Sequence, residues 1–141
     1  MRIGSDEEFI EITELERAPQ HLPNAGDVRV CVHVKFKEFA GPYDSVWLEA
    51  PVLKDFIAAL DNLEAQRNGS VVLESSSPNE FRLNIRSRDT QGHLVAEVSL
   101  SRYQYSGPTY WRTSVSGGFE LDPRSLPSVL QAFKALHGSN A

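Results

Sequence analysis

The chain has 141 residues, of which 40% are hydrophobic and 23% charged, and its net charge is -5 at pH 7. These values are typical of one soluble domain with its own core, and no apolar run is long enough to span a membrane. Because 19 acidic residues outnumber 14 basic ones, the composition excludes a general nucleic-acid binder. We therefore expect a single domain over residues 1–141, with no nucleic-acid or membrane partner.

The N-terminal segment is acidic and lacks the basic and apolar regions of a signal peptide. A single cysteine, Cys31, allows no intramolecular disulfide, as is usual in reducing compartments. Both features predict a cytoplasmic protein. The acids of this segment are Asp6, Glu7, Glu8, Glu11, Glu14 and Glu16.

The first part of the chain predicts three strands. Phe9 to Leu15 forms the first, and a turn-rich link follows from Ala18 to Gly26. Residues 28–37 then alternate between apolar and polar side chains, which predicts a strand with one buried face. Gly41-Pro42 breaks the pattern before a short strand, Tyr43 to Glu49. The polar face of the second strand carries Arg29, Cys31, His33, Lys35 and Lys37.

A helix is expected from about Pro51 to Arg67, because apolar residues recur there at helical spacing. Pro51 is compatible with the first turn, where its missing N–H has no partner, and Asn68-Gly69 ends the helix. The apolar stripe consists of Leu53, Phe56, Ile57, Leu60 and Leu63.

The second part predicts four or five strands and a last helix. The strands are Val71 to Ser75, Phe81 to Arg88, Leu94 to Arg102 and Tyr110 to Ser116, with Phe119 to Leu121 as a further short one. Ser125 is the expected N-cap of the helix, because Pro127 fits only in a first turn. Its buried stripe is Leu126, Val129, Leu130, Phe133 and Leu136.

These elements define an α+β fold of order βββα-ββββα. Short connections favour a mostly antiparallel sheet of six to eight strands. Because its strands alternate instead of being apolar throughout, we expect both amphipathic helices to pack on one face of this sheet. The strand residues expected beneath the helices are Val30, Val32, Val34, Leu83, Ile85, Ala96 and Val98.

Residues 47–63 are echoed by residues 120–136, with Leu48 matching Leu121 and Leu53 matching Leu126. Both stretches are typical of a strand that runs into an amphipathic helix. The match does not extend upstream. Shared helical spacing explains the echo more simply than internal duplication, although both interpretations stay open.

The sequence contains no common catalytic or cofactor motif. Its four histidines lack the spacing of metal ligands, and phosphate loops and Gly-x-Ser-x-Gly are absent. Ser114 or Ser116 with His93 as base is conceivable, but serines are common at strand ends. Cys31 and His33 share a strand face, where neighbours lie about 7 Å apart, beyond hydrogen-bond reach. We expect a non-enzymatic protein with no catalytic residue, no metal and no cofactor, and a structural role for Cys31.

Arginine and aromatic residues gather in the later strands, and both are enriched where proteins bind proteins. The alternative is a solvated outer face on which the arginines pair across strands with Glu74, Glu80 and Glu97. The set consists of Arg82, Arg86, Arg88, Arg102 and Arg112, with Tyr103, Tyr105, Tyr110 and Trp111 around a turn.

Four features of the sequence carry a family resemblance. They are the motif Tyr43-Asp44-x-x-Trp47-Leu48, the leucine-rich helix after it, Gly69 and Gly92-His93. Over about Tyr43 to Leu136 the chain resembles the WapI-type bacterial immunity proteins and related uncharacterised families, whereas the first forty residues match poorly. The resemblance implies a cytoplasmic antidote to a secreted toxin domain, without cofactor or catalytic residues. It supplies no binding residues.

The leading hypothesis is a protein-binding domain that neutralises a toxin domain by covering it. Its acids would steer a basic toxin, and its arginine and aromatic side chains would anchor the complex. The predicted partner-binding residues are Glu7, Glu8, Glu11, Glu14, Arg86, Arg102, Tyr105 and Trp111. The alternative is a small-ligand-binding protein or small enzyme, with a pocket between sheet and helices lined by Trp47, Tyr103, Tyr105 and Trp111. A purely structural subunit is the third hypothesis, and the sequence leaves the partner and the oligomeric state open.

Overall fold

A computed structural model describes residues 1–138, which form two antiparallel sheets of four strands each. Strand order is β1-β2-β3-β4 in the first sheet and β5-β6-β7-β8 in the second, so within each sheet every strand pairs with its neighbours in sequence. A helix follows each sheet. The elements are β1 (Arg2–Gly4), β2 (Glu8–Arg17), β3 (Val28–Phe36), β4 (Phe39–Leu48), α1 (Ala50–Gln66), β5 (Ser70–Glu74), β6 (Phe81–Ser87), β7 (Leu94–Ser106), β8 (Thr109–Leu121), the 3-10 turn η1 (Pro123–Ser125) and α2 (Leu126–His137).

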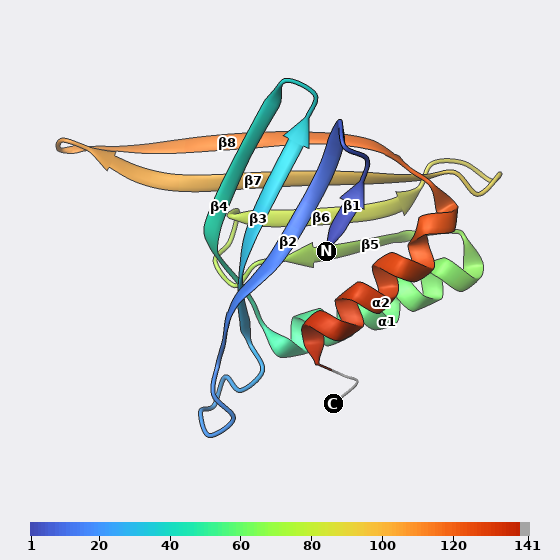
Figure 1. The fold of residues 1–141 in the computed structure, drawn as a ribbon, viewed down its shortest axis with the longest axis horizontal. Helices are drawn as coiled ribbons and strands as arrows, with labels where there is room; N and C mark the ends of the chain where they lie inside the picture. The colour runs from blue at the N-terminus through green and yellow to red at the C-terminus, as the bar shows by residue number, and fades with distance from the viewer. Residues whose placement is uncertain (139–141) are drawn as a thin grey trace.

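The two sheets face each other, and their strands cross at a steep angle in Figure 1. Each strand turns alternate side chains inward, as expected for sheets with one buried face. The inward side chains of both sheets and of both helices form one continuous core. The strand residues expected in the core are all buried: Val30, Val32, Val34, Leu83, Ile85, Ala96 and Val98.

The helices lie side by side along one side of this two-sheet core (Figure 1). α1 also contacts β5, and the rings of Phe56 and Phe133 meet edge to face with centroids 4.9 Å apart. Leu53 and Leu60 are fully buried, as predicted, whereas Ile57 is only half-buried at the margin of the core. Within residues 1–138, neither helix is long and apolar enough to cross a membrane.

The prediction of one sheet covered by both helices is wrong. The helix α1 carries the chain away from β4, and β5 then starts a second sheet. The free edge of β4 contains Pro42, which has no N–H to donate to a further strand, and its pairing with β3 shifts register between Val30 and Val32. The helices therefore close the side of a two-sheet core instead of covering a single sheet.

Several element bounds also differ from the predicted ones. The short strand β1 was missed, because three residues are too few to show an alternating pattern. β4 continues through Gly41-Pro42, which is compatible with an edge strand. β7 extends to Ser106, and β8 runs without interruption through Gly117-Gly118.

The structure extends the sequence echo to the order of elements, because each half of the chain is a four-stranded meander followed by a helix. Glu49 and Asp122 occupy matching N-cap positions, of α1 and η1 respectively. Ser125 is the N-cap residue of α2, as predicted, but its hydroxyl donates to the Asp122 carbonyl (2.6 Å) instead of capping the helix.

Candidate functional site

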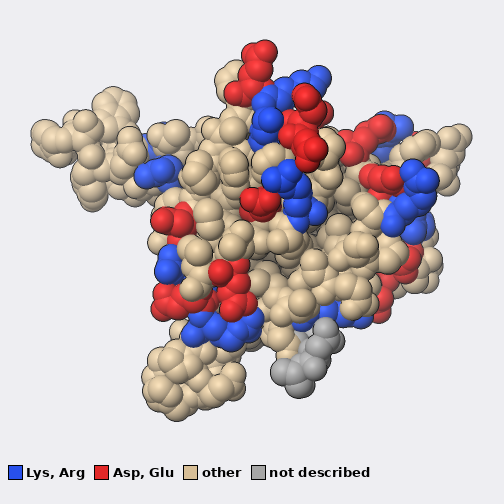
Figure 2. Space-filling view, viewed as in Figure 1, with Lys and Arg blue, Asp and Glu red and all other residues tan. Residues whose placement is uncertain are grey.

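The predicted acidic set lies on the first sheet and the turn before it, and half of it is neutralised locally. Glu11 accepts hydrogen bonds from Arg2 at 3.0 and 3.1 Å, and Glu14 accepts one from Arg17 at 2.6 Å. Glu7 and Glu8 have no ion-pair partner within residues 1–138. Red and blue atoms are accordingly intermixed over this sheet in Figure 2. The segment is not a uniformly acidic surface, and in the described part of the chain only Glu7 and Glu8 of this segment lack an ion-pair partner.

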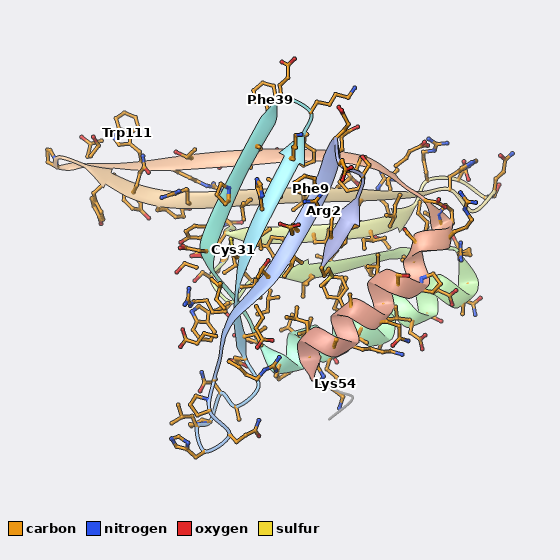
Figure 3. All side chains as sticks on the ribbon, in the orientation of Figure 1. Arg2, Phe9, Cys31, Phe39, Lys54 and Trp111 are labelled. Atoms are coloured by element: carbon orange, nitrogen blue, oxygen red, sulfur yellow. The ribbon has the colours of Figure 1, made fainter. Side chains whose placement is uncertain are left out.

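The outer face of the first sheet is held by contacts within the sheet. The Arg2 guanidinium lies 3.9 Å from the centre of the Phe9 ring, and His33 meets the same ring edge-on at 5.3 Å. Figure 3 shows Arg2 beside Phe9 and Cys31 further along the same sheet. Lys37 does not share this face as predicted, because it adopts a φ of 59° in the β3–β4 turn. The face therefore offers a set of mutually satisfied side chains.

The outer face of the second sheet carries three cross-strand ion pairs. Arg82 pairs with Glu74 at 3.2 Å, Arg86 pairs with Glu97 at 2.6 Å, and Arg88 pairs with Glu120. The alternative interpretation, a solvated outer face on which arginines pair with acids across strands, is thus confirmed for Glu74 and Glu97. Glu80 makes no such pair within the described part of the chain.

Beyond the last residue paired with β6, the strands β7 and β8 continue together as a two-stranded hairpin, which we call the arm (residues 101–114). It projects to one side of the molecule in Figure 1. Its tip is the two-residue turn Gly107-Pro108, and a φ of 63° at Gly107 suits the first central position of a type II′ turn. The arm therefore exposes side chains on both of its faces, away from the core.

Three tyrosines form a cluster on one face of the arm. The rings of Tyr103 and Tyr110 are stacked with centroids 5.0 Å apart, and Tyr105 lies 4.9 Å from Tyr110. Arg112 lies 5.7 Å from the Tyr103 ring and donates to the Ser101 hydroxyl at 3.0 Å. Loss of solvent raises the pKa of Tyr110, and the neighbouring tyrosines raise it further, so its hydroxyl stays neutral. Tyr105 is the most exposed of the three, at 77%.

Arg102 and Trp111 lie on the opposite face of the arm. Register pairs Arg102 with Thr113 and Gln104 with Trp111, so these side chains alternate with the tyrosines. Arg102 lies 5.9 Å from the ring of Tyr43, which comes from β4. Trp111 is 56% exposed, and Figure 3 shows it far out on the arm.

The predicted basic and aromatic partner-binding residues are therefore only partly brought together. Arg102, Tyr105 and Trp111 share the arm, but Tyr105 points to one face and the other two point to the opposite face. Arg86 lies opposite Val95, roughly 33 Å along β7 from Tyr105. Arg86 belongs to the ion-paired sheet face and not to the arm.

The predicted pocket of the alternative hypothesis does not form. Trp47 pairs with Arg29 at the far end of β4, whereas Tyr103, Tyr105 and Trp111 lie on the arm. The best-formed depressions in residues 1–138 are lined by other side chains. The space between sheets and helices is instead filled by the apolar core.

The serine and the histidine considered as nucleophile and base, Ser114 and His93, are also separated. The Ser114 hydroxyl shares a hydrogen bond with Ser101 (2.8 Å), and His93 bonds Asp89 (2.7 Å) in the β6–β7 turn. Burial raises the pKa of the Cys31 thiol, and Asp44 and Glu11 raise it further. No group of three His, Cys, Asp or Glu side chains suited to a metal occurs in residues 1–138.

One apolar feature beside β8 was not predicted from the sequence. Phe39, in the β3–β4 hairpin, is 74% exposed, and Phe36 lies against Gly117. Together they line an open depression with residues 114–118 of β8. The sequence signal was a phenylalanine two residues after Lys37, at a hairpin tip where polar residues are usual.

Comparison with protein-family models relates this chain to a known family. The family model described as the immunity protein WapI-like family matches residues 1–138. The match includes the first forty residues, for which a poor match was expected from the sequence. No curated protein and no solved structure matches the chain.

Proposed function

We propose, from the premise that this chain belongs to the WapI-like immunity protein family, that it neutralises a toxin domain by binding it. In this proposal the protein has no chemistry of its own, and it acts by occupying the toxin surface. We expect it to act in the cytoplasm of the cell that must be protected.

The observation that carries the proposal is the arm. Three of its aromatic side chains, Tyr105, Tyr110 and Trp111, are more than half exposed, although such residues are usually buried. Tyrosine, tryptophan and arginine contribute most to the stability of protein complexes when a partner covers them. The arm presents these types on a projecting element, where a partner reaches them without disturbing the core.

The acidic segment has a secondary part in this proposal. Glu7 and Glu8 form no ion pair within residues 1–138, and they can steer a partner with a basic patch during encounter. Glu11 and Glu14 are held by Arg2 and Arg17, so their contribution to the long-range field is smaller. Arg86 is engaged with Glu97 and is the weakest member of the predicted set.

Binding kinetics against the toxin domain encoded next to this gene test the proposal. We expect Tyr105→Ala and Trp111→Ala to accelerate dissociation about tenfold or more, because covered aromatic anchors control residence time. The double change of Glu7 and Glu8 to Gln should slow association and weaken its salt dependence. Leu22→Ala is the matched control, since Leu22 is an exposed apolar residue on a different loop.

Two results would contradict the proposal. One is the absence of any binding between the wild-type chain and that toxin domain. The other is tight binding of a single-stranded oligonucleotide to the arm, because aromatic and arginine side chains also stack on bases.

A further inference from the structure

We infer that the free edge of β8 is a docking site for an extended, acidic segment of the protein partner, which adds to the second sheet as a fifth strand. This inference rests on the proposed function and names the mode of recognition. Strand addition provides main-chain hydrogen bonds for affinity and alternate side-chain contacts for specificity.

The backbone of β8 is unpaired along one side. It is the terminal strand of the second sheet, and within residues 1–138 its only strand partner is β7. The N–H of Ser101 donates to the Glu80 carbonyl, so it points away from β8. Ser101 lies opposite Ser114, which makes this a pair without mutual hydrogen bonds. By alternation, Ser114 and Ser116 direct their N–H and C=O groups outward from the sheet edge.

The other three sheet edges are protected against strand addition. β1 has three residues, and β5 has five and lies against α1. β4 contains Pro42 and a register shift. These are the devices by which proteins usually block edge pairing. β8 has thirteen residues in continuous register with β7, and it contains neither proline nor lysine.

An apolar depression runs beside this edge. Phe36 and Phe39 line it together with residues 114–118, and Phe39 is 74% exposed. Figure 3 shows Phe39 at the end of the β3–β4 hairpin, which reaches past β8. A Cβ at Gly117 would lie 3.1 Å from the Phe36 ring, so Gly117 allows this close approach. This depression could accommodate apolar side chains from alternate positions of an added strand.

The charge of the arm favours an acidic segment as the occupant of this edge. The arm carries Arg102 and Arg112, and all 19 acids of the chain lie outside it. Figure 2 shows basic atoms at the base of the projecting arm and uncharged atoms beyond them. An acidic segment that extends along β8 towards the arm would place carboxylates near these arginines.

Ser116→Pro tests the inference, because proline removes an outward N–H that no other group in residues 1–138 uses. Proline is tolerated at such edge positions, so the fold should be retained. Ser116→Ala is the matched control, since it removes the hydroxyl but keeps the N–H. We expect the proline variant to weaken binding of the adjacent gene's toxin domain about tenfold or more, and the alanine variant to change it less than about twofold.

Residue-resolved hydrogen exchange supplies the second measurement. In the free protein the amides of Ser114 and Ser116 should exchange rapidly, whereas those of Thr113 and Val115 should be protected. In the complex the outward amides should become protected as well. Tight binding without this protection, or equal affinities of the two Ser116 variants, would overturn strand addition and leave the proposed function standing. A lack of binding by the wild type would instead overturn the proposed function, and a dimer formed through β8 would replace the toxin segment by a second copy.

Discussion

At the scale of single residues, Cys31 shows how a strand position determines reactivity. The thiol lies half-buried on the outer face of the first sheet, next to the charges of Asp44 and Glu11. Because burial and these charges raise its pKa, little thiolate is present near neutral pH. The thiolate is the nucleophilic form, so a residue of this kind is suited to packing and not to catalysis.

We therefore predict that Cys31 reacts slowly with iodoacetamide at pH 8, and faster when the protein is unfolded in urea. Mass spectrometry of the alkylated protein measures both rates. Cys31→Ser should preserve toxin binding. Rapid alkylation of the folded protein, or loss of binding by a folded serine variant, would show that this thiol has a functional part.

Asp122 gives a second prediction, which concerns pH. Hydrogen bonds from the Arg124 side chain and backbone N–H lower the pKa of Asp122. Because the carboxyl has a lower pKa in the folded state than in the unfolded state, it stabilises the fold at any pH above its unfolded-state pKa of about 4. This stabilisation is lost as the pH falls through the folded-state pKa. Asp122→Asn keeps an acceptor for the cap but does not titrate. Its melting temperature should lie below that of the wild type at pH 7, and the difference should shrink by pH 3.

Asp61→Asn is the control for this measurement, because it removes one negative charge from an exposed position of α1. A difference between wild type and Asp122→Asn that stays constant from pH 7 to pH 3 would mean that the carboxylate does not stabilise the N-cap by its charge.

At the scale of elements, the arm is separable from the domain. The core includes Leu94 to Leu100 of β7 at alternate positions, and beyond Ser101 every residue of the hairpin up to Ser114 is exposed. The two-stranded arm is held by cross-strand pairs and by a compatible turn. Its removal should therefore affect binding much more than folding.

We predict this outcome for a variant in which residues 103–112 are replaced by Asn-Gly. Arg102 and Thr113 would then flank the new turn. Hydrogen-bonded and non-hydrogen-bonded residue pairs alternate along an antiparallel ladder, and the neighbouring Ser101–Ser114 pair is non-hydrogen-bonded. Arg102 and Thr113 are therefore a hydrogen-bonded pair, which suits a two-residue loop. Thermal unfolding should shift by only a few degrees, and toxin binding should be lost. Retained binding by the shortened chain would show that the arm is not the anchor.

At the scale of the whole molecule, the core depends on residues that join both sheets to the helices. Leu60 of α1 is fully buried, whereas Ile57, at the centre of the stripe predicted from sequence, is half-buried. Large-to-small substitutions cost most where the cavity cannot collapse or fill with water.

Leu60→Ala should therefore lower the free energy of unfolding by about 2 to 5 kcal/mol, and Ile57→Ala by less than about 2 kcal/mol. Urea denaturation followed by tryptophan fluorescence measures both. An equal loss for the two variants would mean that Ile57 is as well packed as Leu60.

Much of the fold was predictable from local patterns. The alternation of residues 28–36 identified β3 and its buried face, and the leucine spacing identified both helices. Of the candidate site, the placement of Tyr105 and Trp111 around one turn was predicted correctly. Their opposite faces follow from alternation along one hairpin, but the predicted strand ended at Arg102, so this was not recognised.

The sequence by itself determined most of the strands, both helices and which of their sides are buried, because the spacing of apolar residues reflects local backbone geometry. Only the tertiary structure decided that β5 leaves β4 and starts a second sheet. It also decided that Arg2 and Arg17 neutralise part of the acidic segment, and that β8 keeps an open edge beside Phe39. These features depend on strand pairing and on contacts between segments far apart in the chain, and the periodicity of one segment carries no information about its partner.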